Sequence, residues 1–242
     1  MRDFTLILPY YDQPAMLARQ VQEWEGYPEG VRVIVVDDAS PGHPAVDIIP
    51  ETSRAWILRV EVDIPWNRNH ARNLGAHVAE TDWILHTDID HILPVASAQQ
   101  LLEREVDPAH WYRFARDRVG RADETRQKDA LSPDAVRGSI KPHVDSFLCT
   151  RELYWKAGGY DEDFRGSLGG SSLFLKHMGI DGGDPITLPI KLEVHTSDSV
   201  SDASENKLPR DRTRYMRIRQ AKRDQGDPKP KDVLRCKWER VR

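Results

Sequence analysis

The stretch that decides the fold is Val31-Arg-Val-Ile-Val-Val-Asp-Asp-Ala-Ser40. Residues 31–36 are apolar at all positions but one, which predicts a strand buried on both faces of a parallel sheet. Two carboxylates follow directly after it. The stretch Trp83-Ile-Leu-His-Thr-Asp-Ile-Asp90 repeats this arrangement. Apolar strands that end in polar residues are typical of an open α/β sheet, which binds ligands at the carboxyl ends of its strands.

The rest of the chain continues the alternation of strands and helices that an α/β sheet requires. Further strands are predicted at residues 4–8, 56–62, 147–150 and 186–194. Helices are predicted over 12–25 with Asp12 as cap, from Asn67 or Asn69 onwards, after Ser97, after Thr150, and over 211–223. The polar residues 115–141 and the glycine-rich residues 166–183 are predicted to be loops.

Composition limits the class of protein. The 242 residues carry a formal net charge of −4, and 39% of them are hydrophobic, which suits one compact domain. Cys149 and Cys236 form neither a disulfide framework nor a zinc site. No apolar run approaches the ~20 residues that span a bilayer, and the first residues do not resemble a signal peptide. We therefore expect a cytoplasmic protein without a transmembrane segment.

The charge is unevenly distributed along the chain. From Lys207 to Arg242 there are 14 Lys and Arg against 5 Asp and Glu, a net charge of +9, whereas residues 1–206 carry −13. This asymmetry divides the chain into an acidic body over 1–206 and a basic tail over 207–242. Two interpretations stay open: the tail binds a polyanion such as nucleic acid, or it folds back onto the acidic body.

Two of the acidic residues are spaced to act together. In an extended chain residues i and i+2 point to the same face, so Asp88 and Asp90 can converge on one point. Two adjacent carboxylates repel each other unless a cation or a shared proton relieves them. Mg²⁺ or Mn²⁺ would do so and would also bind phosphate oxygens. The alternative is a solvated turn.

Four motifs occur in one order along residues 4–195, and together they resemble the family 2 glycosyltransferases of the GT-A fold. They are Val35-Val-Asp-Asp-Ala-Ser40, Asn69-His-Ala-Arg-Asn-Leu-Gly-Ala76, Thr87-Asp-Ile-Asp-His91 and Gly158-Gly-Tyr-Asp-Glu-Asp-Phe164. The resemblance implies a GT-A (Rossmann-like) open mixed, mostly parallel sheet flanked by helices, with a basic C-terminal extension. It also implies a metal-dependent transferase that uses a nucleotide sugar, with a UDP-sugar as the expected donor.

The resemblance assigns the nucleotide to the ends of the first two strands. Pro9, Tyr10 and Tyr11 would lie along the base and ribose, and Asp38 would accept hydrogen bonds from them, with Asp37 as its neighbour. The alternative for Asp38 is a helix cap.

Arg72, in the second motif, would face the nucleotide or its phosphates, which suit a planar guanidinium. Its alternative is a surface arginine that pairs with Glu80 or Asp82.

The resemblance also implies a metal site. Asp88 and Asp90 match the D-x-D motif of the family, in which the second carboxylate binds the metal and the first contacts ribose or sugar. His195 follows the last strand and would be an additional metal ligand, or else an ordinary strand-end histidine. His86 and His91 are expected to pack beside the motif.

The sequence departs from the family at the general base. Ser171 and Ser172 stand where the family has an acidic pair, and a serine cannot accept a proton at neutral pH without a base of its own. A base could come from Asp145, Asp163, Asp181 or Asp184. Alternatively, the acceptor needs little base assistance, or the protein binds a nucleotide sugar without turning it over.

The leading hypothesis is thus an inverting glycosyltransferase. Its acceptor is a hydroxyl group, with a hydroxylated base in DNA suggested by the basic tail, as in some bacteriophage enzymes, and a polysaccharide or lipid as alternatives. The alternatives in function are a non-catalytic nucleotide-sugar-binding module and a nucleotidyltransferase. The latter ranks last because Leu8-Pro-Tyr-Tyr-Asp-Gln-Pro14 has neither the glycine nor the basic residue of a phosphate loop.

Overall fold

A computed structural model describes residues 1–120, 139–203 and 208–242. The interior of the predicted loop at 115–141 lies outside these ranges, as does the junction between the body and the tail. Among the described residues no helix is long and apolar enough to cross a membrane.

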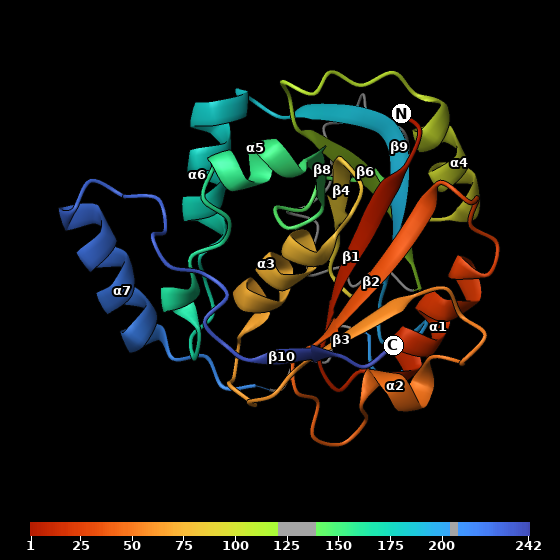
Figure 1. The fold of residues 1–242 in the computed structure, drawn as a ribbon, viewed down its shortest axis with the longest axis horizontal. Helices are drawn as coiled ribbons and strands as arrows, with labels where there is room; N and C mark the ends of the chain where they lie inside the picture. Colours follow the sequence, from red (N-terminus) through yellow and green to blue (C-terminus); the bar gives the residue numbers. More distant parts are fainter. Residues whose placement is uncertain (121–138, 204–207) are drawn as a thin grey trace.

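The centre of the fold is a ten-stranded mixed sheet in the order β10-β3-β2-β1-β4-β8-β6-β9-β5, with β7 paired to β6 (Figure 1). Its strands are β1 (Phe4–Tyr10), β2 (Val31–Asp37), β3 (Trp56–Val60), β4 (Trp83–His86), β5 (His91–Ile92), β6 (Tyr112–Val119), β7 (Ser139–Ile140), β8 (Phe147–Thr150), β9 (Ile186–His195) and β10 (Trp238–Arg240). The strands β3, β2, β1 and β4 are parallel. Beyond β4 only the β6–β9 pairing is parallel, so the expectation of a mostly parallel sheet holds for the N-terminal half.

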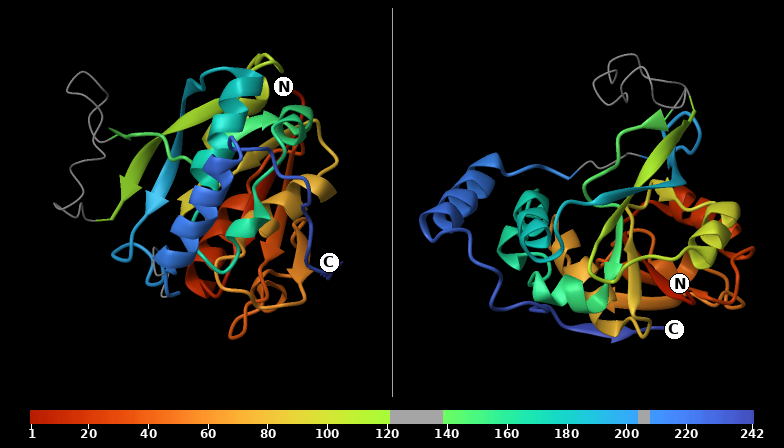
Figure 2. Two further views of the ribbon diagram at one scale, coloured as in Figure 1. Left: turned by 90° about the vertical axis from the view of Figure 1, so that its left-hand side faces the viewer. Right: turned by 90° about the horizontal axis from the view of Figure 1, so that it is seen from above.

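Helices cover both faces of the sheet and make three layers (Figures 1 and 2). They are α1 (Pro14–Trp24), α2 (Ala45–Ile48), α3 (Arg68–Val78), α4 (Val95–Glu103), α5 (Arg151–Lys156), α6 (Ser171–Gly182) and α7 (Arg212–Asp224). α1, α2 and α4 pack on one face, and α3, α5 and α6 on the other. Successive residues of a strand point to opposite faces, so Leu6 and Leu8 join the first core and Ile7 the second.

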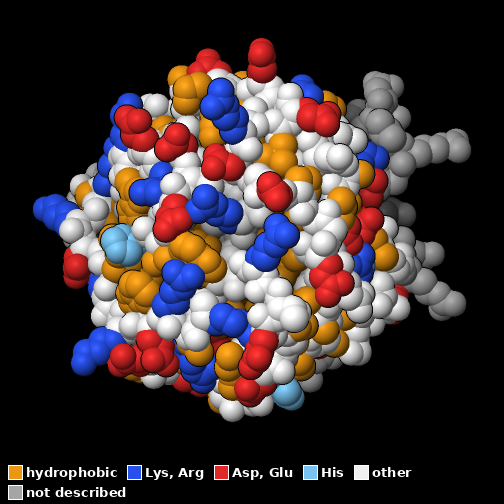
Figure 3. All heavy atoms as spheres, turned by 45° about the vertical axis from the view of Figure 1, so that its right-hand side comes forward, with side chains coloured by type: hydrophobic (Ala, Val, Ile, Leu, Met, Phe, Trp, Pro, Cys, Tyr) orange, Lys and Arg blue, Asp and Glu red, His pale blue; other side chains and the backbone are white. Residues whose placement is uncertain are grey.

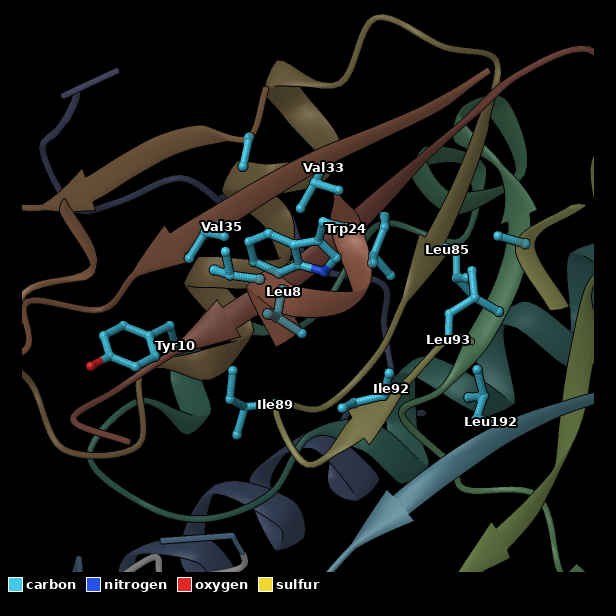
Figure 4. Packing of buried hydrophobic residues seen from close by; sticks show 14 of the residues in the cluster. Leu8, Tyr10, Trp24, Val33, Val35, Leu85, Ile89, Ile92, Leu93 and Leu192 are labelled. Atoms are coloured by element: carbon cyan, nitrogen blue, oxygen red, sulfur yellow. The ribbon is translucent and has the colours of Figure 1, made fainter. Parts of the chain in front are cut away.

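Trp24 at the end of α1 packs over Leu8, Val33 and Val35 in the first core (Figure 4). Ile89 belongs to the same core. The residue between the two acids of the D-x-D motif therefore packs in the core, while Asp88 and Asp90 on either side of it are only partly buried.

The basic tail folds back onto the body, which was one of the two interpretations of its charge. β10 adds an antiparallel strand to β3, and Lys222 pairs with Asp161 and Asp163 at 2.8 and 2.5 Å. Arg240 stacks on Trp56 with 3.7 Å between the guanidinium carbon and the ring centroid. α7 lies outside α6 (Figure 2). Acidic and basic side chains are interspersed on the face shown in Figure 3.

Several local predictions differ from the structure. Residues 115–119 belong to β6 rather than to a loop, and α6 replaces most of the predicted loop at 166–183. Asp12 does not cap α1: its carboxylate accepts a hydrogen bond from the backbone of His43 at 2.7 Å. The start of α1 is capped instead by Asp202, which accepts from Ala15 and Met16 at 2.7 and 2.8 Å.

Gly75 sets how closely α3 approaches the sheet. A Cβ atom at Gly75 would lie 2.3 Å from Cγ2 of Ile7 on β1, which is a severe overlap. We predict that Gly75→Ala lowers the free energy of unfolding by about 1–3 kcal/mol, because overpacking forces the helix away from the sheet. Urea unfolding measures this change.

The matched control is Gly179→Ala on α6, where a Cβ atom would meet nothing within 4 Å. This variant should be neutral or more stable by up to about 1 kcal/mol, because alanine is the better helix former. Equal stability losses in the two variants would contradict the packing argument.

Candidate functional site

A cleft of about 430 Å³ lies where β1, β2 and β4 end. The strand order reverses between β1 and β4, which is the place where open α/β sheets bind ligands. The residues that line it include most of the predicted site residues: Pro9, Tyr10, Tyr11, Gln13, Asp38, Trp66, Arg68, Arg72, Asp88, Ile89, Asp90, His143, Val144, Asp145, Leu168, Ser171 and Arg210.

Asp88 and Asp90 both face this cleft, as their spacing predicts. The loop that carries them is held from below by Gln20 of α1. Its buried side-chain amide donates to the carbonyl groups of Ile89 and His91 at 2.9 and 3.0 Å. Burial, together with the charge of Asp88, raises the pKa of Asp90 to about 6.

Arg72 is a fully buried guanidinium in the wall of the cleft, so the alternative of a surface pair is wrong. One nitrogen, Nη2, donates to Asp88 and lies 3.8 Å from Asp145. The guanidinium lies 5.1 Å from the centroid of the Tyr160 ring. Its Nε and Nη1 have no hydrogen-bond partner among the described residues. Both of these atoms are buried, so the charge of Arg72, rather than these two donors, acts on the cleft.

Asp145 is the one candidate base that lines the cleft. It accepts a hydrogen bond from the Tyr160 hydroxyl at 2.9 Å and lies 3.5 Å from Arg68, which in turn contacts the Ser171 hydroxyl at 3.3 Å. Burial acts to raise the pKa of Asp145, but Arg72 and Arg68 outweigh it and hold the pKa below its usual range. The carboxylate of Asp145 therefore lies beside Ser171, one of the two serines that stand where family 2 glycosyltransferases have an acidic pair.

A group of side chains at the end of the cleft can hold a cation. Ligand atoms of Asp88, His91 and His143 lie within 4.8 Å of one another. His91 does not fit a ligand role, because its Nδ1 contacts the Ser146 hydroxyl at 2.6 Å and its Nε2 contacts Arg116 at 3.2 Å. Burial lowers the pKa of His91 to about 3, so the ring is neutral and accepts from the guanidinium.

His143 fits this role better. Its Nδ1 lies 3.2 Å from Asp88, its side chain is 31% exposed, and it lines the cleft beside Asp90. The carboxylate of Asp90 lines the same cleft but is not one of the three groups whose ligand atoms lie within 4.8 Å of one another. No motif contains His143, so sequence analysis had no reason to select it.

The other end of the cleft suits a nucleoside. Pro9, Tyr11 and Trp66 line it together with Asp38, whose carboxylate accepts from the Asn67 amide at 2.9 Å. Burial raises the pKa of Asp38 to about 7. Asp38 caps no helix: α2 begins after Pro44.

Asp37 serves the loop rather than the cleft. Its buried carboxylate accepts from the backbone of Ser40 and Ala45 at 2.8 and 2.9 Å and from Arg59 at 2.7 Å. These bonds hold the turn that presents Asp38. The side chain of Tyr10 is also mostly buried. Its ring is 1% exposed, and its hydroxyl group donates a hydrogen bond to the backbone carbonyl of His43.

Three carboxylates considered as bases lie elsewhere. Asp181 pairs with Lys229 at 2.7 Å, and Asp163 pairs with Lys222 and Arg235. Neither these two nor the exposed Asp184 lines the cleft. The expected loop around Asp181 is the last turn of α6, which carries it away from the site.

His195 is also not where the resemblance implied. Its backbone donates to the carbonyl of Asp90 at 2.9 Å, but its ring points to Glu193 and Ser199 at 3.5 and 3.2 Å. It does not line the cleft. His86 packs as expected, stacked against Phe147 and Tyr154 with ring centroids 5.1 Å apart in each case.

Two of the sequence motifs bind each other beneath the cleft. Asn73 of α3 donates to Glu162 and to the carbonyl of Tyr160, both at 2.8 Å. Glu162, with no exposed surface, also contacts His70 at 3.1 Å and accepts from the backbone of residues 234 and 235 at 2.7 and 3.1 Å. One carboxylate thus joins α3, the Gly158–Phe164 motif and the tail.

We predict that Glu162→Gln lowers the free energy of unfolding by about 2 kcal/mol or more, because an amide cannot accept all of these bonds and leaves buried donors unpaired. The control is Asp163→Asn, whose half-exposed ion pairs are worth about 0–1 kcal/mol. Thermal and urea unfolding of both variants tests the difference; similar losses would show that burial of Glu162 is not what matters.

Comparison with known proteins rests on structure alone. No family model matches the sequence, and no curated sequence matches it either. Residues 1–349 of TarS from S. aureus superpose with a TM-score of 0.59 at 14% identity, over 81% of this chain and 61% of that one.

Two further structures are similar. The mannosyltransferase PcManGT from Pyrobaculum calidifontis, solved with GDP-Man and Mn²⁺, has a TM-score of 0.54 at 20% identity, over 92% of this chain and 62% of its own. GalNAc-T7, solved with UDP, GalNAc and Mn²⁺, has a TM-score of 0.58 at 13% identity, over 81% and 44%. The chain thus spans less than two thirds of these neighbours. Its α/β mixed sheet flanked by helices is similar in structure to the GT-A glycosyltransferases.

Proposed function

We propose that the chain is a metal-dependent glycosyltransferase that moves a sugar from a nucleotide diphosphate sugar, a UDP-sugar first among candidates, to a hydroxyl acceptor with inversion. The observation that carries the proposal is the cleft itself. Asp88, Asp90 and His143 line it beside two arginines, Arg68 and Arg72, at the carboxyl ends of the strands. The ligands found in the two similar transferases support it.

In this proposal the nucleoside lies against Pro9, Tyr11 and Trp66, and Asp38 accepts hydrogen bonds from it. The diphosphate lies toward Arg68 and Arg72, which both line the cleft. Asp88, Asp90 and His143 would hold a divalent cation, with His143 in place of the expected His195. Bound there, the cation would supply positive charge to stabilise the diphosphate leaving group.

Asp145 is the proposed general base. The acceptor oxygen forms a bond to the anomeric carbon, the bond from that carbon to the diphosphate breaks, and the hydroxyl proton passes to the Asp145 carboxylate. In the free protein Arg68 and Arg72 make this carboxylate a weak base. A bound diphosphate competes for the same guanidinium groups and so raises the basicity of Asp145.

The first experiment tests donor use. UDP and GDP should bind in calorimetry only when Mn²⁺ is present, and the matching nucleotide sugar should be slowly hydrolysed without an acceptor. Binding without any hydrolysis or transfer would favour the non-catalytic module, which the serines at 171 and 172 also suggest. Absence of nucleotide binding would reject both.

The cation site is tested by His143→Ala. We predict that this variant binds Mn²⁺ about tenfold more weakly, or worse, because it loses a nitrogen ligand. His195→Ala should bind Mn²⁺ like the wild type, because its ring faces Glu193 and Ser199. Electron paramagnetic resonance of Mn²⁺ measures the affinity of both variants. If only His195→Ala bound Mn²⁺ more weakly, His195 rather than His143 would be the metal ligand.

The base is tested by Asp145→Asn, which keeps the shape and the contact with Tyr160. The transfer rate should fall by about 100-fold or more while nucleotide affinity changes little. Asp181→Asn and Asp184→Asn serve as controls and should keep the wild-type rate, because neither residue lines the cleft. A full transfer rate in Asp145→Asn would refute the assignment.

The suggestion of a DNA acceptor in a bacteriophage-type enzyme depended on a free basic tail. Arg219, Lys222, Lys229 and Arg235 are each paired with a carboxylate. The tail thus has less charge to offer a polyanion than its sequence indicates, and we do not extend the proposal to DNA.

A further inference from the structure

A second groove, of about 410 Å³, adjoins the cleft. It lies between the loop before α6 and the start of α7, and it shares two lining residues, Leu168 and Arg210, with the cleft. We propose that this groove binds the acceptor and that the acceptor is an anionic glycan. The inference rests on the proposed function, because it places the acceptor beside the donor.

The walls of the groove are mainly apolar and partly rigid. Tyr215 packs against Phe164 with ring centroids 5.8 Å apart, and it lies so close to Gly169 that a Cβ atom there would be 2.5 Å from the ring. Met216 beside it is 58% exposed. A fixed aromatic ring beside exposed apolar surface suits the apolar face of a sugar ring.

The charges at the groove distinguish it from the rest of the tail. Arg210 stacks on Trp66 at 5.7 Å, and Arg212 is exposed; neither has an ion pair among the residues that the structure describes. The one acid in the groove, Asp211, accepts from the backbone of Arg214 at 2.8 Å and caps α7. The lining thus presents two guanidinium groups without a carboxylate partner, and these favour a phosphate or carboxylate on the ligand.

The position of the groove agrees with an acceptor site. It opens into the cleft at Leu168, on the side where Ser171 and Asp145 also line the cleft. A glycan held by its charged group at Arg210 and Arg212 therefore extends toward the proposed base. No other part of the tail combines apolar lining with unpaired arginines at the edge of the cleft among the described residues.

Direct binding tests this inference without relying on turnover. The probes are glucose 6-phosphate and a hyaluronan tetrasaccharide, each compared with a neutral counterpart, glucose and chitotetraose. Ligand-observed nuclear magnetic resonance measures their affinities in the absence of nucleotide. We expect each anionic probe to bind about tenfold more tightly than its neutral counterpart, because charge-assisted hydrogen bonds are the stronger ones.

Arg210→Ala and Arg212→Ala should each remove most of this preference. Arg217→Ala is the matched control, since it removes the same charge from the exposed face of α7 without lining the groove. Equal binding of neutral and anionic probes would overturn the inference. Equal losses of this preference in Arg217→Ala and Arg212→Ala would also overturn it. The same holds if an oligothymidine binds more tightly than the glycan probes and both substitutions weaken its binding equally. Either outcome indicates a diffuse basic surface.

Calorimetry of UDP and GDP with Mn²⁺ on the same variants separates this inference from the proposed function. Arg212→Ala should bind nucleotide like the wild type. Nucleotide binding without any glycan preference rejects the groove and leaves the transferase proposal intact. Glycan preference without nucleotide binding in the wild type rejects the transferase proposal, and with it the acceptor role of the groove.

Discussion

The site depends on the burial of one guanidinium. Arg72 has no exposed surface and therefore needs negative charge close by, which Asp88 and Asp145 supply. One of these carboxylates follows β4 and the other precedes β8, so the cation on α3 draws together the ends of two adjacent antiparallel strands. The same cation weakens the basicity of Asp145 and leaves two donors unused.

A second constraint joins the tail to this arrangement. Glu162 accepts hydrogen bonds from α3 and from the backbone of residues 234 and 235, and it is fully buried, so each of these partners must be in place for the others to be satisfied. The tail is thereby part of the wall of the site. Arg210 lies over Trp66, which adopts a positive φ of 59° directly before α3. A strained residue in that position agrees with a functional contact between tail and cleft.

The predictions succeeded where the signal was local. The apolar run at 31–36 became β2, and the i, i+2 spacing of Asp88 and Asp90 placed both on the cleft, because strand geometry alone dictates these outcomes. Other predictions depended on contacts that the order of residues along the chain does not show. His195 has the right place in the chain, but its ring finds Glu193 and Ser199 nearer, and His143 lies beside Asp88 instead. The helix start expected at Asp12 is capped by Asp202, 190 positions away in the chain.

The amino-acid sequence by itself determined the alternation of strands and helices, the carboxylates at the strand ends and the unequal charge of body and tail. These follow from periodicity and composition, which act over a few residues. Only the tertiary structure decided which charges meet. Asp181 pairs with Lys229, away from the site. Asp145 lies beside Ser171 and Arg72. The tail forms an edge strand of the sheet and one wall of the second groove. The physical reason is that a buried charge is stable only beside a partner, and the partner is chosen by distance in space, not in sequence.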